Sequence, residues 1–179
     1  QRLGTAHAVI TATKYFEGEK GTVLVIYGDT PLLTLDTIEN LISARQTDAD
    51  PAVVVLGFRS EKAGDYGRLI LNNDGNLEKI VEANDATPGE LKTQLCNSGV
   101  MAIDARLLPS LLQKVTNDNV KGEYYLTDVV ELAIAEGRSC AVIEGVEEEV
   151  IGINSKLDLA EAEAIVQERL RRNALSNGV

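Results

Sequence analysis

The fold is decided by one continuous stretch of the sequence, Thr22-Val23-Leu24-Val25-Ile26-Tyr27-Gly28-Asp29-Thr30-Pro31-Leu32. Its first six residues form an unbroken apolar and β-branched run, which is typical of a strand buried on both faces. Residues 33–45 follow with apolar side chains at helical spacing, and residues 52–58 form another short apolar run. Strand, helix and strand in this order predict a βαβ unit in a parallel sheet.

The sequence on either side completes an α/β sandwich with a mixed sheet. A β-hairpin is predicted at residues 66–71 and 77–82, because a polar turn containing Asp74-Gly75 joins two extended runs. Ligands of such a fold are expected at the carboxyl ends of the parallel strands. The other expected elements are helices at 6–16, 106–115, 126–136 (ending before Gly137) and 155–174, and strands at 96–103, 139–143 and 150–153.

Composition excludes several classes of function. The 179 residues are 44% hydrophobic and carry a formal charge of −11, so we expect one sizeable core and a surface that repels nucleic acid and anionic lipid. The sequence contains no stretch of 18 apolar residues, so it predicts no membrane span. Cys96 and Cys140 are far apart and His7 is the only histidine, which argues against a zinc site or a disulfide framework and favours a reducing cytoplasm.

Polar residues at the ends of apolar runs are the candidates for chemistry. Asp29 directly follows the first strand, where a carboxylate can hold a hard cation such as Mg²⁺ against substrate phosphates. Asn154 stands between an expected strand and the last helix. Each also has a plain structural interpretation, Asp29 as a turn or helix-capping residue and Asn154 as a helix N-cap.

Further candidates lie in three other clusters. Gly4-Thr5 precedes a helix, where glycine lets a ligand approach the backbone. Glu82 and Asn97 are suited to hydrogen-bonding the hydroxyls and amide of a sugar, although solvated strand ends or a bulge would explain them equally well. Thr127 lies in the unusual run Glu123-Tyr124-Tyr125-Leu126-Thr127-Asp128, where helix capping alone could account for it.

Together these segments resemble the uridylyltransferase domain of the bacterial bifunctional N-acetylglucosamine-1-phosphate uridyltransferase/glucosamine-1-phosphate acetyltransferase family. Seven segments match in family order and span almost the entire chain. They are Leu3-Gly4-Thr5-Ala6-His7-Ala8, Tyr27-Gly28-Asp29-Thr30-Pro31-Leu32, Tyr66-Gly67-Arg68, Ile80-Val81-Glu82, Asn97-Ser98-Gly99, Gly122-Glu123-Tyr124-Tyr125-Leu126-Thr127-Asp128 and Gly152-Ile153-Asn154.

The resemblance implies a Rossmann-like nucleotidyltransferase fold with a mixed, mainly parallel sheet. The implied reaction joins UTP and N-acetylglucosamine 1-phosphate into UDP-N-acetylglucosamine and pyrophosphate, for peptidoglycan and lipopolysaccharide precursors. The implied residue roles cover the whole site. Gly4 and Thr5 would contact uracil, Tyr27 and Gly28 would line the nucleotide side, Asp29 and Asn154 would hold Mg²⁺, and Gly67, Glu82 and Asn97, with Thr127 nearby, would recognise the sugar.

The sequence also departs from the family. The glycine-rich Leu-Ala-Ala-Gly-x-Gly-Thr-Arg-Met segment and the Pro-Lys that grip the triphosphate are not among the 179 residues. We therefore expect an N-terminally truncated domain at residues 1–154, inactive by itself, and a long helix at 155–179 leading toward an acetyltransferase domain. Members of the family trimerise through that domain, so a homotrimer is implied only for the parent enzyme.

Two alternative functions remain open at this stage. One is another sugar-1-phosphate nucleotidyltransferase, such as a thymidylyltransferase, on the same scaffold. The other is a non-catalytic fragment that acts as a binding module through its charged C-terminal helix. Mg²⁺-dependent binding of a sugar nucleotide would separate the second alternative from both enzymes.

Overall fold

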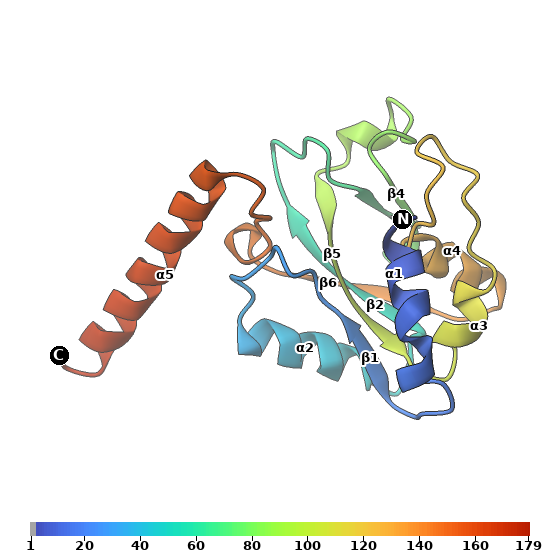
Figure 1. Ribbon diagram of the computed structural model, residues 1–179, viewed down its shortest axis with the longest axis horizontal. Helices are drawn as coiled ribbons and strands as arrows, with labels where there is room; N and C mark the ends of the chain where they lie inside the picture. The colour runs from blue at the N-terminus through green and yellow to red at the C-terminus, as the bar shows by residue number, and fades with distance from the viewer. Residues whose placement is uncertain (1–2) are drawn as a thin grey trace.

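The computed structural model describes residues 3–179 as a six-stranded sheet with helices on both faces (Figure 1). Among these residues, no helix is both long enough and apolar enough to cross a membrane. The strands are β1 (Thr22–Val25), β2 (Val53–Arg59), β3 (Arg68–Leu71), β4 (Leu77–Val81), β5 (Leu95–Asp104) and β6 (Cys140–Glu144). The α-helices are α1 (Thr5–Ala12), α2 (Leu35–Arg45), α3 (Leu108–Leu112), α4 (Asp128–Ala135) and α5 (Lys156–Ser176), with short 3₁₀ turns at Thr13–Tyr15, Glu90–Lys92 and Glu147–Glu149.

The α/β fold class is confirmed, but the prediction of a mainly parallel sheet is wrong. The strand order is β4-β3-β5-β2-β6, and β1 also pairs with β5. In the part of the chain that the structure describes, only β2 and β6 pair in parallel. Strand β5 runs antiparallel to β1, β2 and β3, and β3 runs antiparallel to β4. The expected βαβ unit is interrupted because β5 lies between β1 and β2. A fully buried strand has the same continuous apolar sequence in either direction, so the sequence does not encode this reversal.

The first strand is less buried than its sequence predicts. All four residues of β1 are only partly buried, and Ile26 just beyond it is 43% exposed. Among residues 3–179, β1 pairs only with β5, so it lies at an edge of the described sheet. Residues 23–27 of this segment border an apolar cavity of about 870 Å³, which is closed on another side by α1 residues such as Val9 and by Phe16.

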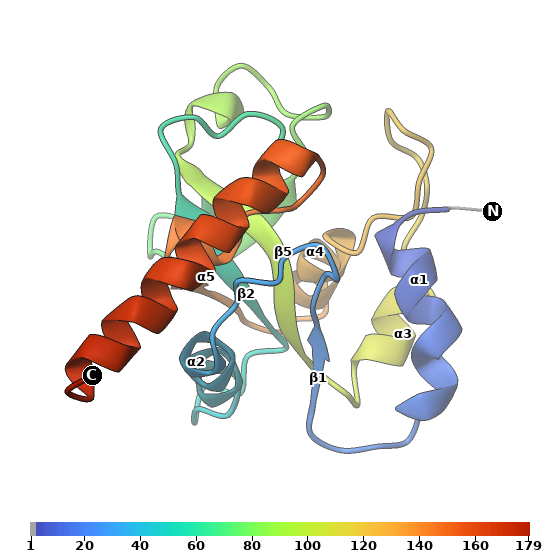
Figure 2. The same ribbon diagram turned by 60° about the vertical axis from the view of Figure 1, so that its left-hand side comes forward.

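Two hydrophobic clusters hold the layers together. The larger one packs α1, α3 and α4 against one face of the sheet, through residues such as Ala6, Leu111 and Val129. The smaller one packs α2 against the other face through Leu41. Figure 2 shows α2 on the opposite side of β1 from α1 and α3. Helix α5 is mostly exposed and is attached through the buried Ala162 and a hydrogen bond from Arg169 Nη1 to the Leu32 carbonyl (2.6 Å).

Most of the other expected elements are present with shifted ends. The hairpin of β3 and β4 is confirmed, and its turn is closed by the Asn72 Oδ1 atom, which accepts the Asp74 and Asn76 amide protons at 2.9 and 3.0 Å. Gly137 follows α4 with φ 75°, as its position after the helix predicted. Residues 150–153 are not a strand. The Val150 amide donates to the Glu147 carbonyl of the preceding 3₁₀ turn, and the Ile153 amide donates to the Asp29 carbonyl.

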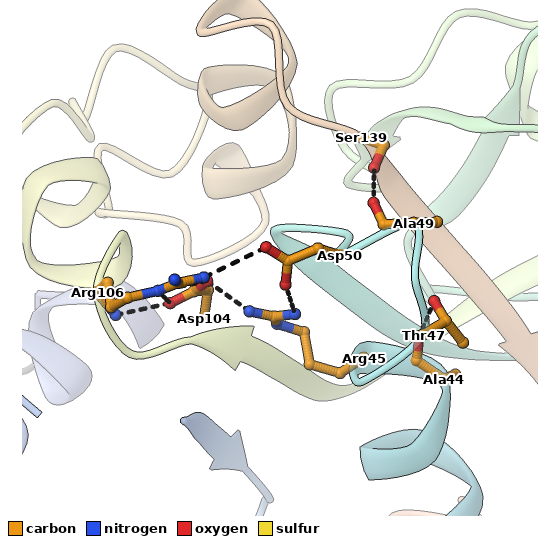
Figure 3. Close-up of polar contacts among 8 residues, drawn as sticks. All are labelled: Ala44, Arg45, Thr47, Ala49, Asp50, Asp104, Arg106 and Ser139. Atoms are coloured by element: carbon orange, nitrogen blue, oxygen red, sulfur yellow. Dashed lines mark hydrogen bonds and ion pairs between the residues drawn. The ribbon is translucent and has the colours of Figure 1, made fainter. Parts of the chain in front are cut away.

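A buried ion-pair network fastens α2 to the end of β5 (Figure 3). Asp104 is 1% exposed and its carboxylate accepts hydrogen bonds from Arg45 and Arg106, and Arg45 is itself only 5% exposed. The Arg45 Nη1 atom also donates to Asp50 Oδ1 at 2.6 Å. Removing one member of such a buried pair leaves an uncompensated charge, which is strongly destabilising.

We therefore predict that Asp104→Asn lowers the free energy of unfolding by about 3 kcal/mol, because Arg45 keeps only the more exposed Asp50 as a counter-charge. Urea unfolding curves measure this loss. The matched control is Glu144→Gln, which breaks the exposed pair with Arg59 and should cost no more than about 1 kcal/mol. Equal losses in the two variants would contradict the role of the network.

The difference in unfolding free energy between the wild type and Asp104→Asn should also depend on pH. Hydrogen bonding to Arg106, assisted by the charge of Arg45, holds the pKa of Asp104 below its ordinary value. A depressed carboxyl pKa gives stability that is complete above the unfolded-state pKa of about 3.9 and is lost as the pH falls through the folded-state pKa. The two unfolding free energies should therefore converge in acid.

Candidate functional site

A cavity of about 510 Å³ opens at one edge of the sheet. Segments that follow β1, β4 and β6 reach it from the carboxyl ends of those strands, while the amino end of β5 and the residues just before β3 also reach it. Its lining consists of Thr5, Tyr27, Asp29, Thr30, Asp65, Tyr66, Gly67, Glu82, Asn97, Ser98, Gly99, Lys121, Glu123, Tyr125, Val150, Gly152 and Asn154.

Asp29 and Asn154, which are 125 positions apart in the sequence, lie on this one cavity. Their segments are joined by a hydrogen bond from the Ile153 amide to the Asp29 carbonyl (2.8 Å). The capping interpretation fails for both residues. Thr34 is the N-cap of α2, and Ser155 is the N-cap of α5 in a capping box with Asp158. Asp29 does lie in a turn, as the alternative interpretation proposed.

The side-chain oxygens of Asp29 and Asn154 are hard donors of the kind that Mg²⁺ or another hard divalent cation accepts. Among residues 3–179, no group of three or more His, Cys, Asp or Glu side chains is arranged to hold a metal ion. Two protein oxygens are nevertheless sufficient for Mg²⁺, which usually keeps several waters and binds through one or two protein groups and substrate phosphates. The pair therefore fits a divalent cation that is shared with a phosphorylated ligand.

Glu82 and Asn97 line the same cavity, and Thr127 contacts Glu82 from outside the lining. Thr127 precedes α4 without capping it, and its hydroxyl donates to Glu82 Oε1 at 3.2 Å. The buried Asn97 turns its Oδ1 atom to the Gly99 amide (2.9 Å). Burial raises the pKa of Glu82, an effect that the Thr127 hydrogen bond and the charge of Lys121 partly oppose. A carboxylate and an amide on one cavity suit a ligand with hydroxyl and amide groups.

Gly67 and Tyr27 shape the cavity through close backbone contacts. The Gly67 carbonyl accepts the Asn97 amide proton at 2.8 Å. The Tyr27 ring lies so close to Gly99, which has φ 84°, that a Cβ atom at residue 99 would come within 2.2 Å of the ring. Burial and the nearby Glu82 raise the pKa of the Tyr27 phenol. Tyr27 is therefore held in place as a wall of the cavity.

Gly4 and Thr5 fasten α1 to the segment before α4. The Thr5 hydroxyl accepts the Leu126 amide proton at 2.9 Å. Gly4 has φ 108°, and a Cβ atom there would lie 2.4 Å from the Tyr124 carbonyl. Thr5 lines the main cavity, whereas Gly4 lines the neighbouring apolar one and Gly28 lines neither. Thr127 is likewise absent from the lining, and reaches the cavity only through Glu82.

Three residues without a predicted role contribute to the chemistry of this region. Tyr125 lines the cavity and donates to Asp85 Oδ2 (3.4 Å), and burial together with the charges of Asp85 and Glu82 raises its pKa to about 12. Lys121 is the cationic side chain among the described lining residues, beside four acidic ones. Burial and neighbouring carboxylates raise the pKa of Asp128 to about 6. The aromatic pair marked Tyr125 in the sequence, but no local pattern distinguished Lys121.

Comparisons with known proteins identify the family of this chain. A family model described as "Nucleotidyl transferase" matches residues 1–148. The chain is 56% identical over 178 residues to the "Bifunctional protein GlmU" of Rhodospirillum rubrum, covering 99% of this chain and 40% of that protein. Proteins of the same name from Paramagnetospirillum magneticum and Azorhizobium caulinodans are 53% and 51% identical, again over 99% of this chain and 39% of each relative.

The chain thus spans about two fifths of the length of the curated relatives that it matches. The family model covers most of the sequence and includes Asp29, Glu82 and Asn97 of the cavity, although it ends before Asn154. The resemblance drawn from the seven segments is confirmed at the level of the family. From its match over residues 1–148, the chain belongs to the nucleotidyl transferase family.

Proposed function

We propose that this chain forms the metal- and sugar-binding part of a uridylyltransferase that makes UDP-N-acetylglucosamine and pyrophosphate from UTP and N-acetylglucosamine 1-phosphate. One observation carries the proposal. A single cavity is lined both by the oxygen donors Asp29 and Asn154 and by the hydrogen-bonding pair Glu82 and Asn97. A divalent cation with phosphates at the first pair, and an N-acetylated sugar at the second, are the ligands that these groups suit.

The metal in this proposal is Mg²⁺, held by Asp29 and Asn154. When bound, it neutralises charge on the reacting phosphates and restricts their geometry. Asp29 contributes the negative charge that attracts the cation, and Asn154 contributes a neutral amide oxygen. The hydrogen bond from Ile153 to the Asp29 carbonyl keeps the two segments adjacent, so that little reorganisation is needed when the ligand arrives.

The remaining residues of the chain position the substrates. Glu82 accepts hydrogen bonds from sugar hydroxyls, Asn97 donates its amide protons to the N-acetyl oxygen, and the Gly67 backbone closes that end of the pocket. Thr127 acts through Glu82 by donating to its carboxylate. Gly4 and Thr5 form the uracil side by fixing α1 against residues 124–126, with Tyr27 and Gly28 along the nucleotide.

With these groups in place, the sugar phosphate oxygen attacks the α-phosphorus of UTP and pyrophosphate leaves. Such a displacement requires no covalent intermediate on the protein, so catalysis consists mainly of positioning and charge stabilisation. An acidic cavity disfavours bound phosphates unless cations compensate for it. Lys121 supplies one positive charge from this chain, at a place where its field reaches Glu82.

We further propose that residues 1–154 are part of the uridylyltransferase domain and that residues 155–179 lead from it toward an acetyltransferase domain. The mostly exposed surface of α5 supports this view. In this proposal the parent enzyme is a cytoplasmic homotrimer that supplies peptidoglycan and lipopolysaccharide precursors. Its partners are small molecules, with no role for nucleic acid or membrane.

The intact natural protein should release pyrophosphate from UTP and N-acetylglucosamine 1-phosphate in the presence of Mg²⁺. It should prefer UTP strongly to dTTP, and N-acetylglucosamine 1-phosphate to glucose 1-phosphate. The 179-residue chain should give no comparable release, because its sequence holds no glycine-rich phosphate loop. A preference for dTTP would contradict the assignment of substrate, and full turnover by the 179-residue chain would contradict its predicted inactivity.

Asp29→Asn should lower kcat/KM by at least about 100-fold, which corresponds to about 2.7 kcal/mol of transition-state stabilisation. The same variant should need a higher Mg²⁺ concentration for half-maximal rate. Asp65→Asn removes one negative charge from the same cavity and should cost less than about tenfold. If both variants lose kcat/KM to a similar extent and depend on Mg²⁺ concentration in the same way, the effect is one of general charge and the metal assignment is contradicted.

Glu82→Gln should raise the KM for the sugar phosphate by about tenfold to hundredfold at neutral pH, as expected for hydrogen bonds to a charged group worth about 1.5–3 kcal/mol. Because burial raises the pKa of Glu82, protonation should weaken sugar binding at a higher pH than for an ordinary glutamate. The ratio of the variant KM to the wild-type KM should therefore fall on acidification. Titration of the substrate itself cancels in this ratio, and a ratio independent of pH would contradict the role of the carboxylate.

A further inference from the structure

Two chain segments carry the proposed metal donors, residues 29–37 with Asp29 and residues 149–154 with Asn154. One link between them is the hydrogen bond from the Ile153 amide to the Asp29 carbonyl. A second link lies outside the cavity, where the Glu149 carboxylate meets the beginning of α2. Glu149 and the two threonines that it contacts do not line the cavity.

The second link consists of several hydrogen bonds to one carboxylate. Thr37 Oγ1 donates to Glu149 Oε2 at 2.5 Å. Thr34 Oγ1 lies 3.1 Å from Oε2 and 3.3 Å from Oε1, and the Thr34 amide lies 3.4 Å from Oε2. Thr34 is also the N-cap of α2, so the carboxylate is placed at the positive end of that helix, which favours a negative charge.

The rest of residues 145–154 is anchored on both sides of Glu149. The Gly145 amide donates to the Gly57 carbonyl at 2.8 Å, and Val150 is 1% exposed within the core. The chain from Glu149 to Asn154 is short, and it includes Ile153, whose amide donates to the Asp29 carbonyl. Any shift of Glu149 relative to α2 should change the separation of the Asp29 and Asn154 oxygens.

We propose that Glu149 is a positioning residue for the metal donors, which holds residues 149–154 against residues 29–37 through Thr34 and Thr37. This inference rests on the proposed function, because it assumes that Asp29 and Asn154 bind a divalent cation. Residues that orient metal ligands from outside their contact shell typically change metal affinity by about 10–100-fold when they are replaced. The neighbouring Glu147 and Glu148 have no such contact in the described residues, and both are exposed.

The test is a Mn²⁺ titration of the intact natural protein saturated with UDP-N-acetylglucosamine, in which electron paramagnetic resonance measures free Mn²⁺. A titration without protein corrects for Mn²⁺ bound by the nucleotide sugar alone. Glu149→Gln should raise the Kd for Mn²⁺ about tenfold, because the amide cannot accept every hydrogen bond that the carboxylate accepts. Glu148→Gln, from the same 3₁₀ turn, should leave the Kd within about twofold of wild type.

Thr37→Val provides a second, nearly isosteric variant that removes only the hydroxyl donor to Glu149. It should raise the Kd in the same direction, and the double variant with Glu149→Gln should add little to the larger single effect, because the two residues act as a pair. Melting temperatures of all the variants show whether each one folds. A change in melting temperature with the Kd for Mn²⁺ unchanged would mean that the contact is only structural, and would overturn the inference.

The outcomes also separate this inference from the proposed function. Wild-type protein should bind Mn²⁺, and Asp29→Asn should abolish that binding. If both results hold while Glu149→Gln and Thr37→Val bind Mn²⁺ with the wild-type Kd, the positioning role is contradicted and the proposed metal site stands. If wild type and Asp29→Asn bind Mn²⁺ equally, the proposed metal site fails and this inference fails with it.

Discussion

The pairing of β5 along both of its edges is the constraint on which the rest of the structure depends. All ten of its residues are buried, β2 pairs along one edge, and β1 and β3 share the other. Because β5 runs antiparallel to β1, its amino end lies toward the carboxyl end of β1, which brings Asn97 to the segment that carries Asp29. At the same end of β5, Arg68 of β3 pairs with both Cys96 of β5 and Val81 of β4, which brings Asn97 to the segment that carries Glu82. A parallel β5 would place Asn97 at the opposite edge of the sheet.

Local chemistry predicted the elements well, while the direction of strands could not be predicted. The turn at Asn72-Asn73-Asp74-Gly75 encodes its own geometry, because an asparagine oxygen closes it and Gly75 adopts φ 81°. Helix ends were similarly readable, as at Gly137. In contrast, β5 carries no residue that distinguishes one direction from the other. The residues of the cavity were predicted largely from the family resemblance, since Asp29, Glu82 and Asn154 are ordinary polar residues in isolation.

Capping provided the strongest alternative interpretation for Asn154 and Thr127, and in the structure neither side chain caps its helix. Ser155 with Asp158 caps α5, so the Asn154 side chain is not needed for that purpose. The Thr127 hydroxyl turns to Glu82 instead of the backbone of α4. The sequence could not settle either case, because adjacent Asn154 and Ser155 both have side chains that cap helices. Only the three-dimensional course of the backbone decides which of them does so.

In the proposed function, the charges of the cavity connect sugar recognition to metal binding. Asp29, Asp65, Glu82 and Glu123 line it beside Lys121, so its field opposes a ligand that carries phosphates. Glutamate and asparagine suit the sugar because they accept and donate hydrogen bonds to hydroxyl and amide groups, yet the same carboxylate repels the phosphate attached to that sugar. A divalent cation at Asp29 would make the electrostatic potential positive at the place where phosphates would lie. Binding free energies are reciprocal, so a cation that strengthens phosphate binding is itself held more tightly once the phosphate is present. If the proposed function holds, the acidic cavity couples the two ligands, and the small number of protein donors for the metal follows from that coupling, since substrate oxygens would complete the coordination.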